Sequence, residues 1–262
     1  MPSDESTGAK RAPEHPESGM SASPGALPPD AEELKARASE SALSEDAALS
    51  LLKHADLPTD VLEQLGKNGS VLKSRKVKLA LVEHPKTPRH ISLPLVRQLY
   101  TFDLMQVALT PVVPADVKLA ADEALCNRLE TLASGERLTL AHRGSGRIAE
   151  ALLCDGEARV VQAALQNSRL TEASIVRALA RHDTSGAFVG AVSHHPQWSL
   201  RREVRVALLR NEKTPIAKAI EFARTLPLAL VREILHGSRL LGYVKTNVLA
   251  EIEKRGKGKV SS

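Results

Sequence analysis

Apolar side chains beyond residue 30 recur every three or four positions, the spacing that places them on one face of an α-helix. Segment 200–208 is a clear example, because its apolar stripe runs at i, i+4, i+7 and i+8 while arginines stand off it. The stripe is Leu200, Val204, Ala207 and Leu208, and the arginines are Arg201, Arg202 and Arg205. No segment alternates apolar and polar residues long enough to predict a strand. The pattern therefore predicts an all-α fold.

The same turn recurs along the chain. Each copy has an apolar helix end, a polar residue, a short turn and a new helix. Aligned on that turn, the first column holds His54, His84, Thr110, Asn167, His195 and Asn211. Four residues later the second column holds Pro58, Pro88, Pro114, Thr171, Ser199 and Pro215. A degenerate copy places Arg143 and Arg147 in these columns. Most spacings between copies match one helical hairpin per repeat.

The turn has a specific physical interpretation. In Thr87-Pro88 and Thr214-Pro215 the hydroxyl is expected at the N-cap and the proline at the first helical position, where its missing N–H costs nothing. Thr171 and Ser199 are expected to cap their helices in the same way without a proline. The His and Asn column fits the end of the preceding helix. Asn tolerates the left-handed conformation there, and His can approach exposed carbonyls.

Three regions follow from composition along the chain. Residues 1–30 are rich in Pro, Ser, Gly and acids, which predicts a disordered tail. Residues 31–254 form the predicted helical repeat domain, with Asp30 as its first N-cap and with final helices over 228–235 and 243–253. Residues 255–262 are predicted to be a basic, frayed end.

Charge is distributed unevenly. Residues 1–50 carry four basic and ten acidic side chains, a net of −6, so that residues 51–262 hold 32 basic against 21 acidic, a net of +11. This favours an anionic partner, although solubility alone also explains such charge. No apolar run approaches a membrane span, and no secretory signal is evident. We therefore expect a cytoplasmic protein, with Cys126 and Cys154 as free, buried thiols.

The ALxxHPxTPxxxxxxL turn and the ALLRN-x-x-TP turn resemble HEAT-like and leucine-rich-repeat-variant units of bacterial proteins, over roughly Leu51 to Leu235. The resemblance implies an irregular right-handed α-solenoid of HEAT-like helical hairpins, whose surfaces bind partners. Aromatic residues are only 2% of the chain, and Leu and Ala fill the predicted core, as in helices packed closely together. The variable repeat lengths leave the curvature open.

Catalytic and metal chemistry find little support in these residues. His54, His84 and His195 occupy one column, so stacking would separate them by roughly 10 Å, too far to share a metal ion. Gly144-Ser145-Gly146 matches no nucleophile elbow or phosphate loop and predicts a flexible turn. The sequence indicates no cofactor, no metal and no enzymatic activity.

The strongest binding candidate surrounds the only tryptophan. Trp198, beside His195 and followed by Arg201, Arg202 and Arg205, is a candidate to stack a base or hold a phosphate. The alternative is that Trp198 staples the turn to the preceding helix. A second basic group comprises Arg137, His142, Arg143 and Arg147, and the two groups are hypothesised to form one ridge.

These observations favour a non-enzymatic interaction scaffold that binds an acidic protein or peptide. Nucleic-acid binding through the basic ridge is the alternative. HEAT-like alkylpurine DNA glycosylases also engage DNA with such a stack, but they rely on a cleft acid among aromatics, and no such acid can be named here. The sequence predicts neither the partner's identity nor an oligomeric state.

Overall fold

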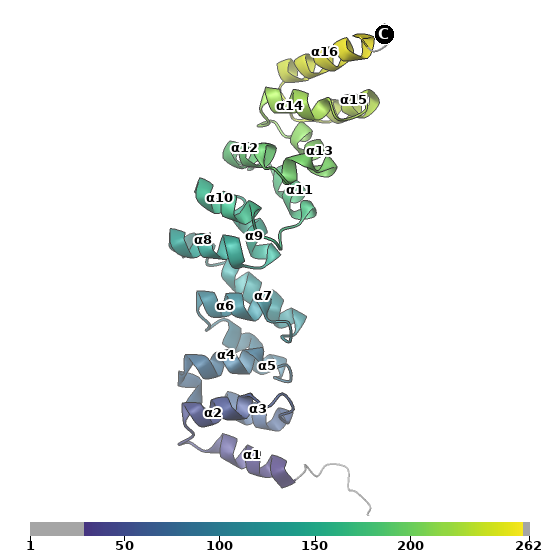
Figure 1. Ribbon diagram of the computed structural model, residues 1–262. Helices are drawn as coiled ribbons and strands as arrows, with labels where there is room; N and C mark the ends of the chain where they lie inside the picture. The colour runs from purple at the N-terminus through teal and green to yellow at the C-terminus, as the bar shows by residue number, and fades with distance from the viewer. Residues whose placement is uncertain (1–28, 259–262) are drawn as a thin grey trace, which may run out of the picture.

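Residues 29–258 are described by the computed structural model, in which they form sixteen α-helices and three short 3-10 helices without a strand (Figure 1). This confirms the all-α prediction. The predicted tail lies almost wholly in residues 1–28, outside the described residues. The first helix begins at Pro29, so that Asp30 lies inside it instead of capping it. The last helix continues through Gly258, into the segment predicted to fray.

The helices form two rows. The odd row contains α1 (Pro29–Ser39), α3 (Thr59–Lys67), α5 (Arg89–Val96), α7 (Ala115–Cys126), α9 (Gly146–Leu152), α11 (Glu172–Ala180), α13 (Arg202–Arg210) and α15 (Leu228–His236). The even row contains α2 (Glu45–Leu52), α4 (Arg75–Glu83), α6 (Thr101–Leu109), α8 (Ser134–Arg143), α10 (Ala158–Leu165), α12 (Gly186–His194), α14 (Ile216–Ala223) and α16 (Gly242–Gly258). The 3-10 helices are η1 (Val71–Lys73), η2 (Leu129–Thr131) and η3 (Trp198–Leu200).

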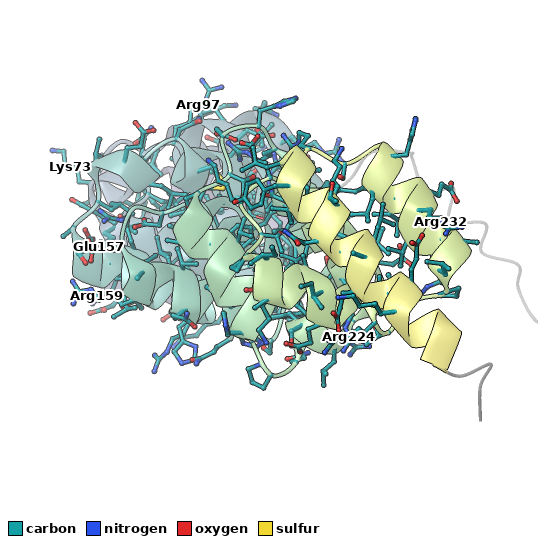
Figure 2. All side chains as sticks on the ribbon, turned by 90° about the horizontal axis from the view of Figure 1, so that it is seen from above. Lys73, Arg97, Glu157, Arg159, Arg224 and Arg232 are labelled. Atoms are coloured by element: carbon teal, nitrogen blue, oxygen red, sulfur yellow. The ribbon has the colours of Figure 1, made fainter. Side chains whose placement is uncertain are left out.

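Contacts define this arrangement. Most helices pack on the next member of their own row, as α7 does on α9 and α10 on α12, and on a neighbour in the other row, as α6 does on α7. The result is an elongated stack that runs from α1 at one end to α16 at the other (Figure 1). Charged side chains such as Lys73, Arg97 and Arg232 project outward around it (Figure 2).

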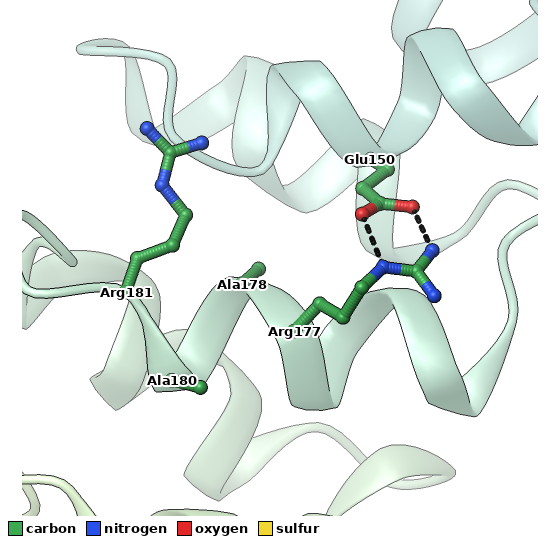
Figure 3. Close-up of a pocket in the computed structure, with 5 residues that line it drawn as sticks. All are labelled: Glu150, Arg177, Ala178, Ala180 and Arg181. Atoms are coloured by element: carbon green, nitrogen blue, oxygen red, sulfur yellow. Dashed lines mark hydrogen bonds and ion pairs between the residues drawn. The ribbon is translucent and has the colours of Figure 1, made fainter.

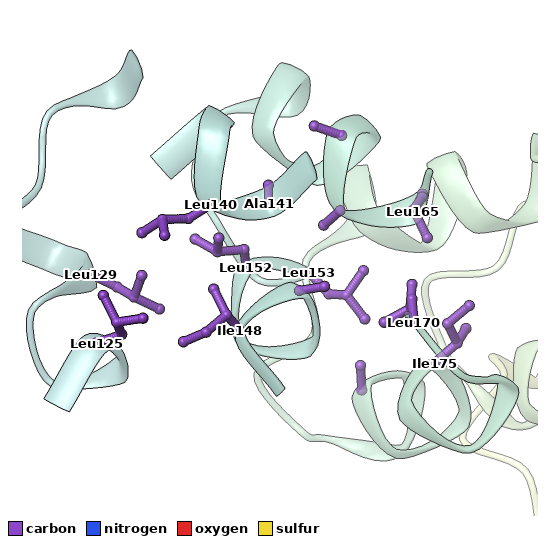
Figure 4. Close-up of a cluster of buried hydrophobic side chains, with 14 of the residues drawn as sticks. Leu125, Leu129, Leu140, Ala141, Ile148, Leu152, Leu153, Leu165, Leu170 and Ile175 are labelled. Atoms are coloured by element: carbon purple, nitrogen blue, oxygen red, sulfur yellow. The ribbon is translucent and has the colours of Figure 1, made fainter. Parts of the chain in front are cut away.

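A continuous core of small and branched aliphatic side chains lies between the rows. Its central part joins α7 to α11 through Leu125, Ile148, Leu153 and Ile175, all of them fully buried (Figure 4). Replacing one such leucine by alanine typically costs 2–5 kcal/mol. The stripe predicted for segment 200–208 is wrong at one position, since Leu200 belongs to η3 and is 67% exposed.

The predicted helix starts are partly wrong. Pro88 and Pro215 themselves occupy the N-cap positions, and the threonines before them turn back to the preceding helix. Thr87 Oγ1 donates to Leu81 O at 2.6 Å, and Thr214 Oγ1 donates to Leu208 O at 2.6 Å. Both threonines are buried. Leaving a buried carbonyl at the helix end without a donor costs more free energy than leaving a solvent-exposed N–H without a cap, so the hydroxyl bonds the carbonyl.

The two expected caps without a proline have opposite outcomes. Thr171 caps α11 as predicted, accepting from Ser174 N at 3.2 Å. Ser199 lies inside η3, and Arg201 takes the N-cap position of α13. The expectation for Ser199 is therefore wrong.

The His and Asn column does more than end its own helices. Asn211 Oδ1 accepts from Lys213 N at 2.9 Å, while its Nδ2 donates to Leu179 O at 2.8 Å, at the end of α11. Asn167 makes the same pair of bonds, to Arg169 N and to Ala141 O. His84 follows with Nδ1 toward Lys86 N and Nε2 toward His54 O. Each side chain thus shapes its own turn and closes the helix end of an earlier repeat.

Asn211 and the histidines His84 and His195 do not adopt the left-handed conformation expected of Asn. His84, His195 and Asn211 have φ of −70°, −70° and −90°. Asn68, which the alignment does not include, makes both kinds of bond, accepting from Ser70 N and donating to Ala38 O. The recurring function is therefore a bridge between repeats.

The degenerate central turn has its own explanation. Ser145 caps α9 by accepting from Ile148 N at 3.2 Å, and its hydroxyl donates to Asp122 at 2.7 Å. A Cβ on Gly146 would lie 2.5 Å from the backbone oxygen of Arg169, in the turn of the next repeat. The predicted flexible turn is thus a tightly packed crossing that requires glycine.

Candidate interaction surfaces

Trp198 is not available for stacking. Its ring is only 5% exposed, and its indole Nε1 donates to Leu165 O at 2.8 Å, at the end of α10. An indole whose N–H is bonded to a buried carbonyl is a structural anchor. The structure therefore supports a staple, although the indole is bonded to α10 instead of the preceding helix α12, and the expectation that Trp198 stacks a base is wrong.

His195 belongs to the same anchor. Its ring lies 6.3 Å from that of Trp198, and its Nδ1 accepts from Gln197 N and Trp198 N at 3.3 and 3.4 Å. Burial lowers the pKa of His195. The imidazole also lines a hollow of about 610 Å³ between α10 and α12, together with Gln162, Gln166, His194 and Gln197. This hollow offers hydrogen-bonding groups and no carboxylate or guanidinium.

The predicted arginines of this region separate into two groups. Arg201 and Arg202 are exposed, and neither forms an ion pair with any residue between 29 and 258. Arg205 instead donates through Nε to Ser199 O at 2.7 Å and lies over the Phe222 ring, 5.8 Å from its centre. Arg201 and Arg202 therefore remain candidate binding residues, whereas Arg205 holds the turn.

The second predicted group is also divided. Arg137, in the first turn of α8, bonds Asp155 and Glu157, both at 2.8 Å, and is mostly buried. Arg143 is exposed at the other end of α8, and Arg147 on α9 lies 3.6 Å from Glu123. The hypothesis of one basic ridge that includes Arg137 is therefore wrong, because the charge of Arg137 is neutralised by two carboxylates.

Four hollows lie along the odd row, and together they form what we call the odd-row groove. They have volumes of about 510 Å³ between α5 and α7, 590 Å³ near the ends of α7 and α9, 460 Å³ at α9 and α11, and 110 Å³ between α11 and α13. The hollow at α9 and α11 shares Arg181 with the one before it and Ala180 with the one after it, whereas the hollow between α5 and α7 shares no lining residue with the others. Small side chains line each one, including Ala120, Ala151 and Ala207.

The charges of the groove are paired in its middle and unpaired at its ends. Seven arginines and six carboxylates line the four hollows. In the hollow at α9 and α11, Arg177 holds Glu150 through two hydrogen bonds of 3.0 and 2.6 Å (Figure 3). Arg97 at one end and Arg210 at the other are exposed, and neither has an ion-pair partner within the described part of the chain.

Ion pairs between neighbouring helices of the odd row occur in its first part and stop after α11. Ion pairs join four of the five steps from α1 to α11: Lys35–Asp60, Arg89–Asp116, Glu123–Arg147 and Glu150–Arg177. At the remaining step Glu63 lies 3.9 Å from His90, a contact that is an ion pair only when the imidazole is protonated. Within residues 29–258, no such pair joins α11 to α13 or α13 to α15. Arg239 there donates to backbone oxygens of Ala180 and Arg181 at 3.3 and 3.4 Å. Charged side chains without an ion-pair partner in the described residues therefore lie on and beside α13, among them Arg201, Arg202 and Arg210 as well as Glu203.

Titratable groups in and beside the groove are shifted for identifiable reasons. The bond to Arg177 lowers the pKa of Glu150. Burial raises the pKa of Asp122, partly offset by its hydrogen bond from Ser145. Burial also raises the pKa of both thiols, Cys126 and Cys154, which are free and half-buried in one hollow. Neither thiol is thus poised as a nucleophile at neutral pH.

Sequence reasoning missed Arg97 and Arg239, because neither belongs to the turn columns. One sequence feature could have indicated the groove: alanines stand on the solvent side of the odd-row helices, where longer polar residues are usual. Among the five hollows described here, the one that holds the buried carboxylate of Asp155 has no aromatic side chain, and Asp155 is bonded to Arg137. It lacks the aromatic cleft that the glycosylase hypothesis requires.

No three His, Cys, Asp or Glu side chains within residues 29–258 are grouped so as to hold a metal ion. No helix in this range is both long and apolar enough to cross a bilayer. In comparisons with known proteins, no family model matches the chain, and no curated protein or solved structure matches it.

Proposed function

We propose that this protein is a non-enzymatic interaction scaffold whose odd-row groove binds an acidic segment of a partner protein. The proposal includes the finer architecture: a right-handed solenoid of HEAT-like hairpins, as the turn motifs suggest. The observation that carries it is the line of four hollows over one row, with arginines lining each hollow. Concave surfaces along stacked repeats are the usual binding sites of such proteins.

The groove suits an extended peptide. From α5 to α13 is four steps of the row, or about 35 Å at ordinary interhelical distances. An extended peptide of about ten residues spans that length. Its carboxylates would meet Arg97 and Arg210 at the two ends, while the alanines of the floor leave room for its side chains. The paired arginines in the middle already hold carboxylates of the chain itself.

Fluorescence anisotropy with a labelled Glu-rich peptide of about ten residues tests the proposal. The double variant Arg97→Glu, Arg210→Glu reverses charge at both ends of the groove, and we expect it to weaken binding at least tenfold. The double variant Arg201→Glu, Arg202→Glu changes the net charge equally but alters residues that line none of the four hollows. Equal effects of the two variants would show attraction by net charge alone, and a larger effect of the second would locate the partner beside η3.

A further inference from the structure

Three aromatic side chains are exposed: Tyr100 and Phe102 at the start of α6, and Tyr243 in α16. The chain has one Trp, two Tyr and three Phe. Trp198, Phe188 and Phe222 are buried, whereas Tyr100 is 63% and Phe102 41% exposed, and both stand at the start of α6. Two large apolar rings separated by one residue on a polar surface require an explanation, because most exposed positions of this protein are charged or small.

An arginine is fixed against the first of these rings. The guanidinium carbon of Arg75 lies 4.9 Å from the centre of the Tyr100 ring. Arg75 is held there by two hydrogen bonds of 2.7 Å to Asp103, whose carboxylate is buried. The guanidinium therefore keeps its position without help from a ligand, and its plane and the phenol ring form a preorganised pair.

Further cations flank this pair in sequence, since Lys73 precedes Arg75 by two residues and Arg97 precedes Tyr100 by three. Lys73 and Arg97 are exposed and form no ion pair within residues 29–258, and both project outward from the stack (Figure 2). Arg128 donates to Leu99 O and Arg97 O, both at 2.7 Å, so that its charge lies beside the turn that precedes Tyr100. Two carboxylates beside this pair are already partnered: Asp103 is held by Arg75, and Glu45 is bonded to Ser74 and Lys76.

We propose that Tyr100, Phe102 and Arg75 form a stacking platform for unpaired bases of a single-stranded nucleic acid, with Lys73 and Arg97 placed for its phosphates. Flat aromatic and guanidinium faces beside mobile cations are the combination that binds single strands without sequence preference. An acidic peptide would use the cations but would leave the rings without a planar partner. The platform shares Arg97 with one end of the odd-row groove, but Tyr100, Phe102 and Arg75 line none of its four hollows.

The test compares two oligomers with the same phosphates. One is a fluorescein-labelled single-stranded thymidine oligomer of about twelve nucleotides, within the span of known single-strand sites, and the other is its abasic analogue. Anisotropy titrations at several salt concentrations should show weaker binding of both at high salt, since phosphate contacts release counterions. The oligomer with bases should bind about tenfold more tightly than the abasic one.

Variants assign that difference to the rings. Tyr100→Ala combined with Phe102→Ala should remove the preference for bases and leave the affinity for the abasic oligomer unchanged. Tyr100→Trp keeps an aromatic ring at this position and should preserve or increase the preference relative to the wild type. Tyr243→Ala is the matched control, because Tyr243 is also 63% exposed and has no arginine over its ring. These rings lie on the surface, so thermal unfolding should stay close to that of the wild type.

Three results would overturn the proposal. The first is equal affinity of the wild type for the two oligomers. The second is an unchanged preference for bases in the Tyr100, Phe102 double variant. The third is binding of a polyglutamate peptide that depends on Tyr100 as strongly as binding of the oligomer does, which would assign the platform to a protein partner. The groove variant Arg210→Glu should leave the preference for bases unchanged.

Discussion

Trp198 and Tyr100 each precede a helix of the stack and each lie near arginines, yet their rings have opposite environments. Trp198 precedes α13, and its indole reaches back 33 residues to bond Leu165 O. Tyr100 precedes α6, and its ring lies on the surface under Arg75. The difference shows that an aromatic beside arginines is not by itself a binding site. What decides its role is whether an open carbonyl of an earlier repeat lies within reach of the side chain.

The largest effect should come from Trp198→Ala. It removes a buried ring and leaves Leu165 O without its donor, so we expect a loss of about 3–5 kcal/mol in the free energy of unfolding. Urea denaturation followed by circular dichroism measures it, with Tyr100→Ala as the exposed counterpart, expected to change stability by less than about 0.5 kcal/mol. Similar losses from the two variants would contradict the comparison.

Asn211→Ala should give an intermediate effect. It removes one bond within the turn and one to Leu179 O, and the buried carbonyl loses its partner, for a cost of about 1–3 kcal/mol. Hydrogen exchange should show faster opening at the end of α11 as well as at the start of α14, since the side chain joins both places. Asn247→Ala is the control, because Asn247 bonds only within its own helix. Faster exchange confined to α14 would argue against a bridge between repeats.

The smallest effect should come from His195→Asn, and it should depend on pH. Burial lowers the pKa of His195 in the folded protein, so its contribution is present above the unfolded value of about 6.5 and is lost as pH falls through the folded value. Asn at equivalent positions accepts the same kind of backbone bond without titrating. The variant should therefore match the wild type at pH 8 and exceed it in thermal stability at pH 5. Parallel losses of stability toward acid would contradict this assignment.

The fold was largely predictable because local periodicity and turn chemistry decide it. The spacing of apolar residues located the final helices near 228–235 and 243–253, and the columns marked the turns. The alignment did not reveal that the residues of those columns bond carbonyls of earlier helices. The partner carbonyl of Asn167 or Asn211 lies 26 or 32 residues away, and pattern alone does not show which side chains reach it.

The candidate surfaces were less predictable for a related reason. Arg137 looks like an exposed basic residue in sequence, but its two carboxylates follow it by 18 and 20 residues and meet it only in the folded stack. Arg97 and Tyr100 carried no repeat signature, although the structure leaves both exposed. Charge and aromatic content identify candidate residues, whereas pairing and burial decide which of them remain open to a partner.

The bonds between repeats also have a direction. Among the side chains of residues 32–254, every donor that reaches a backbone carbonyl of a different hairpin belongs to the later segment, from Asn68 to Arg239. During synthesis on the ribosome, the carbonyl end of each hairpin therefore stays open until the next hairpin emerges and closes it. The donors that close these carbonyls are therefore always synthesised after the carbonyls themselves.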